Sequence, residues 1–174
     1  MEQFGKTVEN PLAIANFFVE KSLATGELLT PMKLVKLVYL AHGWYLGMTS
    51  EPLLTEGVEA WKYGPVVPSV YKAFKAYGGE PITALATSPK SAPQEFVPTV
   101  QDPELEAFLE RMWEVYQSYT GLELSSLTHQ SGTPWDQTWV RQTGRRESPR
   151  IIPNDLIQSY YQSKIDANRS EISA

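Results

Sequence analysis

A histidine, an aspartate and several hydroxyl side chains lie within one short stretch of the sequence, residues 128–136. An imidazole beside a carboxylate can act as a general base when hydrogen bonds align it with a nucleophile or a substrate. The same residue types also cap helix ends, where Thr133 and Asp136 would bind nearby backbone amides. Capping is the simpler interpretation. A catalytic pair of His129 and Asp136 remains the alternative.

The rest of the sequence offers little for catalysis or cofactor binding. Because the chain has no cysteine, thiolate metal sites, cysteine nucleophiles and disulfides are excluded. The other histidine, His42, lies in the most apolar segment and is expected to be a buried structural residue. The eleven glycines are dispersed and form no phosphate-binding loop. We therefore expect no metal, no cofactor and no enzyme activity.

Charge and hydropathy favour a protein partner over nucleic acid or a membrane. The chain of 174 residues has a net charge of −5, which disfavours non-specific binding to phosphate groups. No apolar run approaches the roughly 20 residues that cross a bilayer, and the N-terminus has no signal pattern. A cytoplasmic protein is expected. Four arginines form a cluster that is interpreted as a solvated loop, or alternatively as an anion or acidic-partner patch: Arg141, Arg145, Arg146 and Arg150.

Aromatic side chains are the remaining signal for recognition, since tyrosine and tryptophan dominate the hot spots of protein interfaces. They make up 11% of the chain, and most are expected in the core. Those in predicted turns are expected to be exposed, namely Tyr63, Trp135 and Trp139. Together with His129, they are the candidate partner-binding residues.

Three helix starts combine a capping side chain with a following proline, at Asn10-Pro11, Thr30-Pro31 and Asp102-Pro103. The first two predict helices over residues 11–25 and 30–48. Between Met32 and Tyr45 the second helix has very few polar residues, so it should lie at the centre of the fold, packed on several faces. Its apolar surface also argues against a DNA recognition helix.

The remaining pattern predicts a mainly α fold with a minor β-sheet, in one compact domain spanning residues 1–174. About six or seven helices and two or three short strands are expected. The proline-rich residues 80–102 should form a long loop that is either functional or mobile. The other predicted elements are a strand over Val58–Trp61, a turn at Gly64-Pro65, a helix from Pro68 to Tyr77, a helix from Asp102, a helix opened by the capping box of Thr120 and Glu123, a short helix over Pro134–Trp139, a strand at Ile151-Ile152 that pairs with the first strand, and a last helix from about Pro153.

Three groups of residues, in this order, resemble the Panacea domain, also described as SocA-like. The first group is Lys33–Leu37 with Tyr39 and Ala41–Trp44, the second is Glu59–Trp61 with Tyr63–Val66 and Tyr71, and the third is Leu127–His129 with Gly132–Asp136 and Trp139. The likeness extends over roughly residues 10–165.

This resemblance implies a prophage-associated bacterial antitoxin that neutralises a cognate toxin by direct protein–protein binding. The implied toxins include small alarmone-synthetase-like enzymes that block translation. Some similar proteins act with proteases, so a protease adaptor or a phage regulatory protein is the alternative. A nucleotide-binding protein or an enzyme that uses His129 and Asp136 is a further alternative.

The resemblance implies no catalytic residues, and partner specificity is expected in the variable surface, including the N-terminus and the 80–102 loop. Some similar proteins carry an added DNA-binding segment. The roughly ten residues before the first helix leave no room for one, so direct nucleic-acid binding is not expected.

Overall fold

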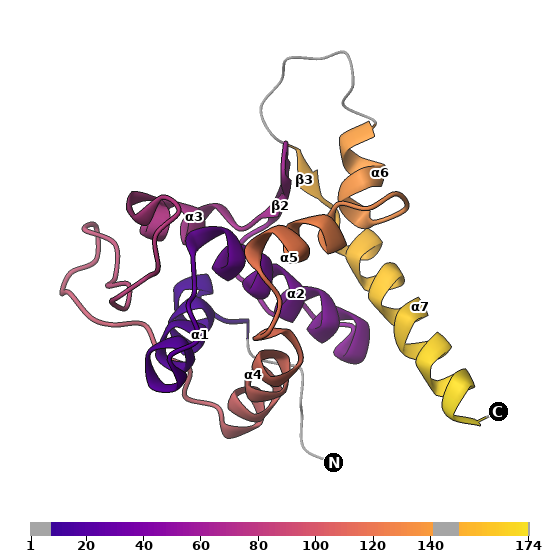
Figure 1. Cartoon of the computed structure of the whole chain (residues 1–174), viewed down its shortest axis with the longest axis horizontal. Coiled ribbons are helices and arrows are strands. Elements are labelled where there is room, and N and C mark those ends of the chain that lie inside the picture. Colours follow the sequence, from indigo (N-terminus) through magenta and orange to yellow (C-terminus); the bar gives the residue numbers. More distant parts are fainter. Residues whose placement is uncertain (1–7, 141–149, 174) are drawn as a thin grey trace.

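A computed structural model of the chain describes residues 8–140 and 150–173. These residues form seven α-helices and a three-stranded antiparallel sheet, which confirms the mainly α fold with a minor sheet (Figure 1). The helices are α1 (Pro11–Thr25), α2 (Pro31–Thr49), α3 (Pro68–Phe74), α4 (Pro103–Tyr116), α5 (Gly121–Thr128), α6 (Pro134–Val140) and α7 (Asn154–Ser173), with a short 3-10 turn η1 (Lys75–Tyr77) after α3. The strands are β1 (Val58–Trp61), β2 (Gly64–Val66) and β3 (Ile151–Ile152).

Helix α2 runs through the centre of the fold, as its apolar sequence predicts. It packs against α1, α3, α4, α5, α7 and β2 (Figure 1). Leu34 and Leu37 are completely buried. Two glycines let α7 approach closely, because a Cβ on Gly43 would lie 2.8 Å from Cζ of Tyr161, and one on Gly47 would lie 3.0 Å from the backbone nitrogen of Gln162.

The predicted helix starts are confirmed by their capping hydrogen bonds. Oδ1 of Asn10 accepts a hydrogen bond from the backbone N–H of Leu12 at 2.9 Å. At the start of α5, Thr120 and Glu123 form a reciprocal capping box, in which each side chain accepts from the other's backbone N–H. These bonds satisfy amides that the first turn of a helix leaves free.

The sheet has the strand order β2-β1-β3, and the predicted pairing of β1 with β3 is confirmed by the register Glu59↔Ile151. The predicted turn at Gly64-Pro65 is wrong. The chain already reverses at residues 62–63, and Gly64 begins β2, paired with Trp61. Gly64 has a φ of +114°, which a residue without Cβ adopts readily, so it can follow directly after the tight turn.

The 80–102 segment contains no helix or strand, but it is fastened to α1 by the completely buried Asn16. Nδ2 of Asn16 donates to the carbonyl oxygens of Ala86 and Pro98, both at 2.9 Å. Oδ1 of Asn16 accepts from the N–H of Ala86 at 2.8 Å. One side chain therefore holds two distant points of this long loop.

Helix α7 lies against α2 in its first half and extends away from the body in its second half (Figure 1). Tyr161 is buried, whereas residues 162–171 are exposed except for the partly buried Ile165. No helix within residues 8–140 or 150–173 has the length and apolar composition needed to cross a membrane.

Candidate partner-binding site

The four candidate residues come from two parts of the sequence, the hairpin tip with Tyr63 and residues 129–139. The two parts meet where the β1–β2 hairpin contacts α5 and α6 (Figure 1). The rings of His129 and Trp135 make an edge contact, with centroids 5.4 Å apart. Trp135 and Trp139 stack, also at 5.4 Å, with an angle of 14° between the rings. The structure thus brings the predicted residues into one neighbourhood.

The hairpin is tied to both helices by side-chain hydrogen bonds. Oγ of Ser125 in α5 donates to the carbonyl oxygen of Tyr63 at 2.8 Å. Nε1 of Trp135 in α6 donates to the carbonyl oxygen of Trp61 at 2.6 Å. The backbone of the hairpin tip, which carries the Tyr63 side chain, is therefore fixed by one hydrogen bond from α5 and one from α6.

Exposure separates these aromatic residues. Tyr63 exposes 63% of its surface, whereas Trp139 and His129 are half-buried. The prediction that Trp135 is exposed is wrong, because its ring packs between His129 and Trp139 and its N–H binds the hairpin. We define the hairpin-end surface as the accessible aromatic and aliphatic residues of this region with the histidine: Trp61, Tyr63, Tyr71, His129, Trp139 and Ile151.

The polar groups of residues 128–136 act as caps, as the simpler interpretation predicts. Oδ2 of Asp136 accepts from the N–H of Gly132 at 2.8 Å, and Oγ1 of Thr133 accepts from the N–H of Asp136 at 3.2 Å. Nδ1 of His129 faces the carbonyl oxygen of Ser125, one helical turn earlier. The nearby Oγ of Ser125 donates its proton to the carbonyl of Tyr63, so it is not aligned as a nucleophile for His129.

Two buried polar residues of α2 support this end of the fold. Nζ of Lys36 is buried beneath the hairpin and donates to the carbonyl oxygen of Pro65 at 2.9 Å. Burial lowers the pKa of Lys36 to about 7, because the charged form loses its hydration. The prediction that His42 is a buried structural residue is confirmed, with Nε2 lying 3.0 Å from Oδ1 of Asn154 and burial lowering its pKa to about 4.

The remaining polar candidates give no metal site in the described part of the chain. Residues 8–140 and 150–173 contain no group of three or more His, Asp or Glu residues that could hold a metal ion. Of the arginine cluster, Arg141, Arg145 and Arg146 lie outside the described residues. Arg150 directly precedes β3.

Comparison with known proteins identifies the family. A family model described as "Antitoxin SocA-like, Panacea domain" matches residues 34–136, which is more than half of the chain. The chain belongs to this family. Antitoxin SocA of Caulobacter vibrioides (strain NA1000 / CB15N) is 33% identical over 126 residues, which cover 71% of this chain and 67% of that protein. No solved structure matches the chain significantly.

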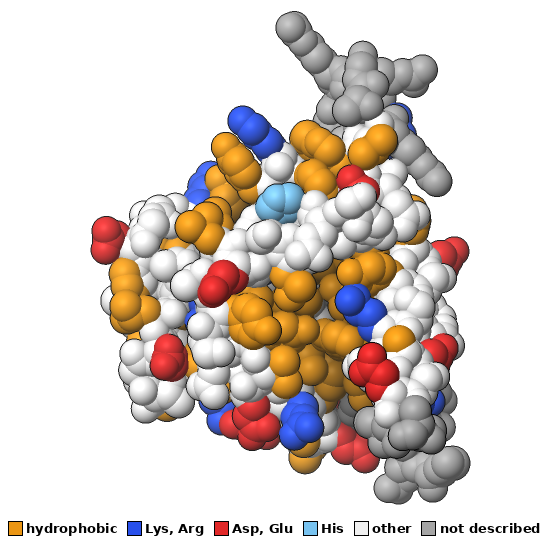
Figure 2. All heavy atoms as spheres, turned by 45° about the vertical axis from the view of Figure 1, so that its right-hand side comes forward, with side chains coloured by type: hydrophobic (Ala, Val, Ile, Leu, Met, Phe, Trp, Pro, Cys, Tyr) orange, Lys and Arg blue, Asp and Glu red, His pale blue; other side chains and the backbone are white. Residues whose placement is uncertain are grey.

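The matched part of this Panacea-family chain also contributes to a second apolar surface, which sequence reasoning missed. Figure 2 shows hydrophobic side chains gathered in a hollow between α4 and α5 on one side and α7 on the other, with α2 beneath. Nε1 of Trp44 donates to Oη of Tyr116 at 2.7 Å, and Trp44 also contacts Tyr161 with ring centroids 5.0 Å apart. We define the aromatic hollow by its ring-bearing residues, Trp44, Tyr116, Tyr119, Tyr160 and Tyr161.

The sequence predicted only that most aromatic residues lie in the core. Trp44 in α2 and Tyr160 in α7 follow the same helical periodicity as completely buried neighbours, so their partial exposure carries no local signal, and Tyr119 lies in the turn after α4. Tyr119 is 40% exposed, and Trp44 and Tyr160 are half-buried. This surface is left uncovered because α4 and α5 lie apart from α7 over the central helix α2.

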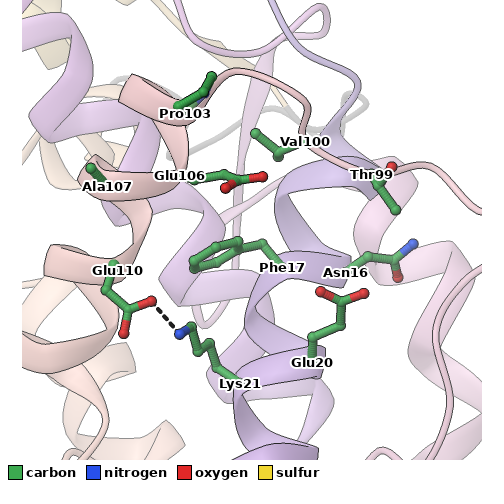
Figure 3. A pocket seen from close by; sticks show the side chains of 10 residues that line it. All are labelled: Asn16, Phe17, Glu20, Lys21, Thr99, Val100, Pro103, Glu106, Ala107 and Glu110. Carbon is green, nitrogen blue, oxygen red and sulfur yellow. Dashed lines mark ion pairs between the residues drawn. The ribbon is translucent and has the colours of Figure 1, made fainter.

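A third feature is a pocket of about 430 Å³ between α1 and α4 (Figure 3). The carboxylates of Glu20 and Glu106 point into it from opposite sides of Phe17, while Lys21 forms an ion pair with Glu110. This lining has carboxylates and an ion-paired lysine, but it aligns no nucleophile with a base. We assign no chemistry to it.

Proposed function

We propose that this protein is an antitoxin that neutralises a cognate toxin by stoichiometric binding, without catalysis. Membership of the SocA-like family supports the antitoxin role. The observation that carries the contact mechanism is the hairpin-end surface. Its Tyr63 exposes 63% of its area, and the backbone of the hairpin is fixed by hydrogen bonds from Ser125 and Trp135. Aromatic anchors that are already positioned lose little conformational freedom on binding, so they contribute strongly to affinity.

The proposed place of action is the cytoplasm, which suits a chain without cysteine. The proposed toxin class includes small alarmone-synthetase-like enzymes, which stop translation. Neutralisation by contact requires only that the antitoxin cover or distort a surface of the toxin. It requires no proton transfer at His129.

The direct test is titration against the toxin encoded beside this chain's gene. The product of the neighbouring open reading frame is co-expressed with and without the chain, and the two proteins are then purified and mixed. We expect co-purification and inhibition of the toxin's effect on translation that saturates at a fixed molar ratio. Growth arrest that persists with the chain present, and no complex on gel filtration, would contradict the proposal.

The interface is tested with two matched tyrosine substitutions. Tyr63→Ala removes an exposed ring from the hairpin-end surface, and we expect it to weaken binding by about 2 kcal/mol, roughly 30-fold in Kd. Tyr119→Ala removes a ring from the aromatic hollow and is expected to change Kd less than about threefold, as for a contact outside the interface. The reverse result would place the toxin in the hollow.

Two further outcomes identify the alternatives. If trace amounts of the chain inactivate toxin over time, and a folded His129→Ala variant does not, the chain is an enzyme. If neutralisation requires loss of toxin protein in cells and fails with purified components, the chain is a protease adaptor. A folded His129→Ala variant that still inhibits at the same ratio supports the contact mechanism.

A further inference from the structure

Basic residues lie next to residues of the hairpin-end surface at three places in the chain. Lys62 lies at the tip of the hairpin, with Nζ 5.2 Å from the centre of the Tyr63 ring. Lys75 follows Tyr71 by one turn, since its backbone N–H donates to the carbonyl of Tyr71. The carbonyl of Arg150 accepts from the N–H of Ala60 at 2.8 Å, which places the backbone of this arginine beside β1.

The carboxylates of the same region keep their negative charge, but each is held in place as an internal hydrogen-bond acceptor. Oε2 of Glu59 accepts from Nε1 of Trp61 at 2.6 Å. Oε1 of Glu56 accepts from the backbone N–H of Ser69 at 3.1 Å, and Asp136 caps the loop before α6. By contrast, Lys62, Lys75 and Arg150 form no ion pair with a carboxylate within the described residues.

The aromatic residues of the surface lie among these cations. Trp61 contacts Tyr71 edge-on, with ring centroids 4.8 Å apart, and so joins the hairpin to α3. Ile151, next to Arg150, is 55% exposed. In the view of Figure 2, the upper part of the molecule shows exposed hydrophobic side chains near a histidine and a basic side chain. Apolar anchors with a charged rim are the usual composition of a protein interface.

We infer that the hairpin-end surface receives an acidic segment of the partner protein, with carboxylates on either side of an apolar or aromatic anchor. This inference rests on the proposed function and specifies the chemistry of the toxin's contact region. The anchor packs on Trp61, Tyr63 and Tyr71, and its flanking carboxylates face Lys62, Lys75 and Arg150. We call these three cations the basic rim. Charges at the edge of an interface mainly speed association and select the partner, whereas the buried anchor sets the dissociation rate.

A nucleic acid would present a different anion to the same cations, and the charge of the chain disfavours it. The net charge is −5, so a long phosphate backbone would meet repulsion beyond this local basic rim. A short acidic segment neutralises the rim without extending over the acidic remainder of the protein. A protein partner therefore fits this surface better than a nucleic acid, and tight binding of nucleic acid there would contradict the inference.

The test compares association rates of charge-reversed variants with the product of the neighbouring open reading frame. The variants are Lys62→Glu alone and the triple change Lys62→Glu, Lys75→Glu and Arg150→Glu. Arg111→Glu is the matched control, because Arg111 is an exposed cation of α4, outside both the hairpin-end surface and the 80–102 loop. Each folded variant is measured by surface plasmon resonance at about 50 mM and about 300 mM salt, where screening differs strongly.

We expect the triple variant to associate at least about tenfold more slowly at low salt, with the difference shrinking at high salt. Lys62→Glu should show a smaller loss in the same direction, and Arg111→Glu should stay within about twofold of the unaltered chain. Tyr63→Ala should mainly accelerate dissociation. This pattern supports an acidic partner segment at the hairpin end.

Two results overturn the inference while leaving the proposed function intact. A complex that forms equally fast with the triple variant has no acidic segment at this surface, and a complex that forms faster has a basic one. Tight binding of a fluorescein-labelled single-stranded RNA, abolished by the triple change while toxin association is unaffected, would assign the rim to nucleic acid. If the unaltered chain forms no complex with the neighbouring gene product, the proposed function fails and the inference with it.

Discussion

Lys36 and Asn16 show how single polar side chains organise this protein from within its core. Each is at most 3% exposed. Lys36 donates to one backbone carbonyl of β2, and Asn16 donates to two backbone carbonyls of the 80–102 loop. Leaving such a carbonyl unpaired in the interior would cost about 1–3 kcal/mol, so these bonds favour one placement of the hairpin and of the 80–102 loop. The surface that presents Tyr63 thus depends on groups that no partner touches.

Lys36 should make the stability of the protein depend on pH above neutrality. Its pKa is about 7 in the folded chain, whereas a solvated lysine keeps its proton up to about pH 10.4. Between these values the unfolded state binds more protons, so the free energy of unfolding should rise with pH, by about 2 kcal/mol from pH 7 to pH 9. Lys36→Met should remove this rise. Urea denaturation of both proteins at pH 7, 8 and 9 measures it, and parallel slopes would contradict the buried, deprotonating lysine.

At the scale of elements, the contact between α2 and α7 decides the shape of the aromatic hollow. Gly43 and Gly47 lie one turn apart on α2 and face Tyr161, so the two helices approach without intervening side chains. Beyond Gln162 helix α7 leaves the body and forms one wall of the hollow (Figures 1 and 2). A small shift of α7 relative to α2 would therefore displace the wall of the aromatic hollow that α7 forms.

Gly43→Ala should test this close crossing. The added methyl group would overlap the Tyr161 ring, which is only 3% exposed. We expect a net loss of about 1–3 kcal/mol, although alanine is favoured over glycine in a helix by roughly 1 kcal/mol. Thermal and chemical denaturation measure the change. The control Gly79→Ala, where a Cβ meets nothing within 4 Å, should leave stability nearly unaltered.

At the scale of the whole molecule, one continuous core joins the helices to the small sheet. It includes residues from α1 to α7 and from all three strands, and α2 contributes many of its completely buried side chains. The hairpin end and the aromatic hollow lie on opposite flanks of α5 (Figure 2), and both include elements that pack on the central helix α2. Loss of packing in α2 should therefore weaken both surfaces together.

Leu37→Ala should destabilise the entire described fold rather than one element. Leu37 is completely buried in α2, and its removal should cost about 2–5 kcal/mol through the lost burial and the remaining cavity. The control Leu28→Ala changes a leucine that is 68% exposed and should cost less than about 0.5 kcal/mol. Helical circular dichroism and tryptophan fluorescence should follow a single urea transition. A loss below about 0.5 kcal/mol for Leu37→Ala would contradict a central role for α2.

The candidate site could be predicted from sequence only in part. Tyr63 falls in a turn and is exposed, as expected, because a hairpin tip has no neighbours to cover it. Trp135 also falls near a turn but is buried, because α5 and α6 fold back onto β1 and give its N–H an acceptor on Trp61. Turn position alone does not distinguish these cases, since burial depends on which distant segment packs against the ring.

The sequence by itself determined the features that depend on neighbouring residues. Capping side chains placed the starts of α1, α2, α4 and α5, because an N-cap binds amides two or three positions further along. The run of apolar residues made α2 central, because a helix that is apolar on every side must be covered on every side. The motif order in the sequence likewise indicated the family that the comparisons confirm.

Only the tertiary structure decided the features that join residues far apart in the chain. Asn16 holds carbonyls 70 and 82 positions away, and Trp44 binds the hydroxyl of Tyr116, 72 positions away. The gathering of Tyr63 with His129 and Trp139 depends in the same way on how α5 and α6 meet the hairpin. Hydrogen bonds and ring contacts of this kind form only when the packing of the core brings distant segments together. A local sequence pattern contains no information about the distances between such segments.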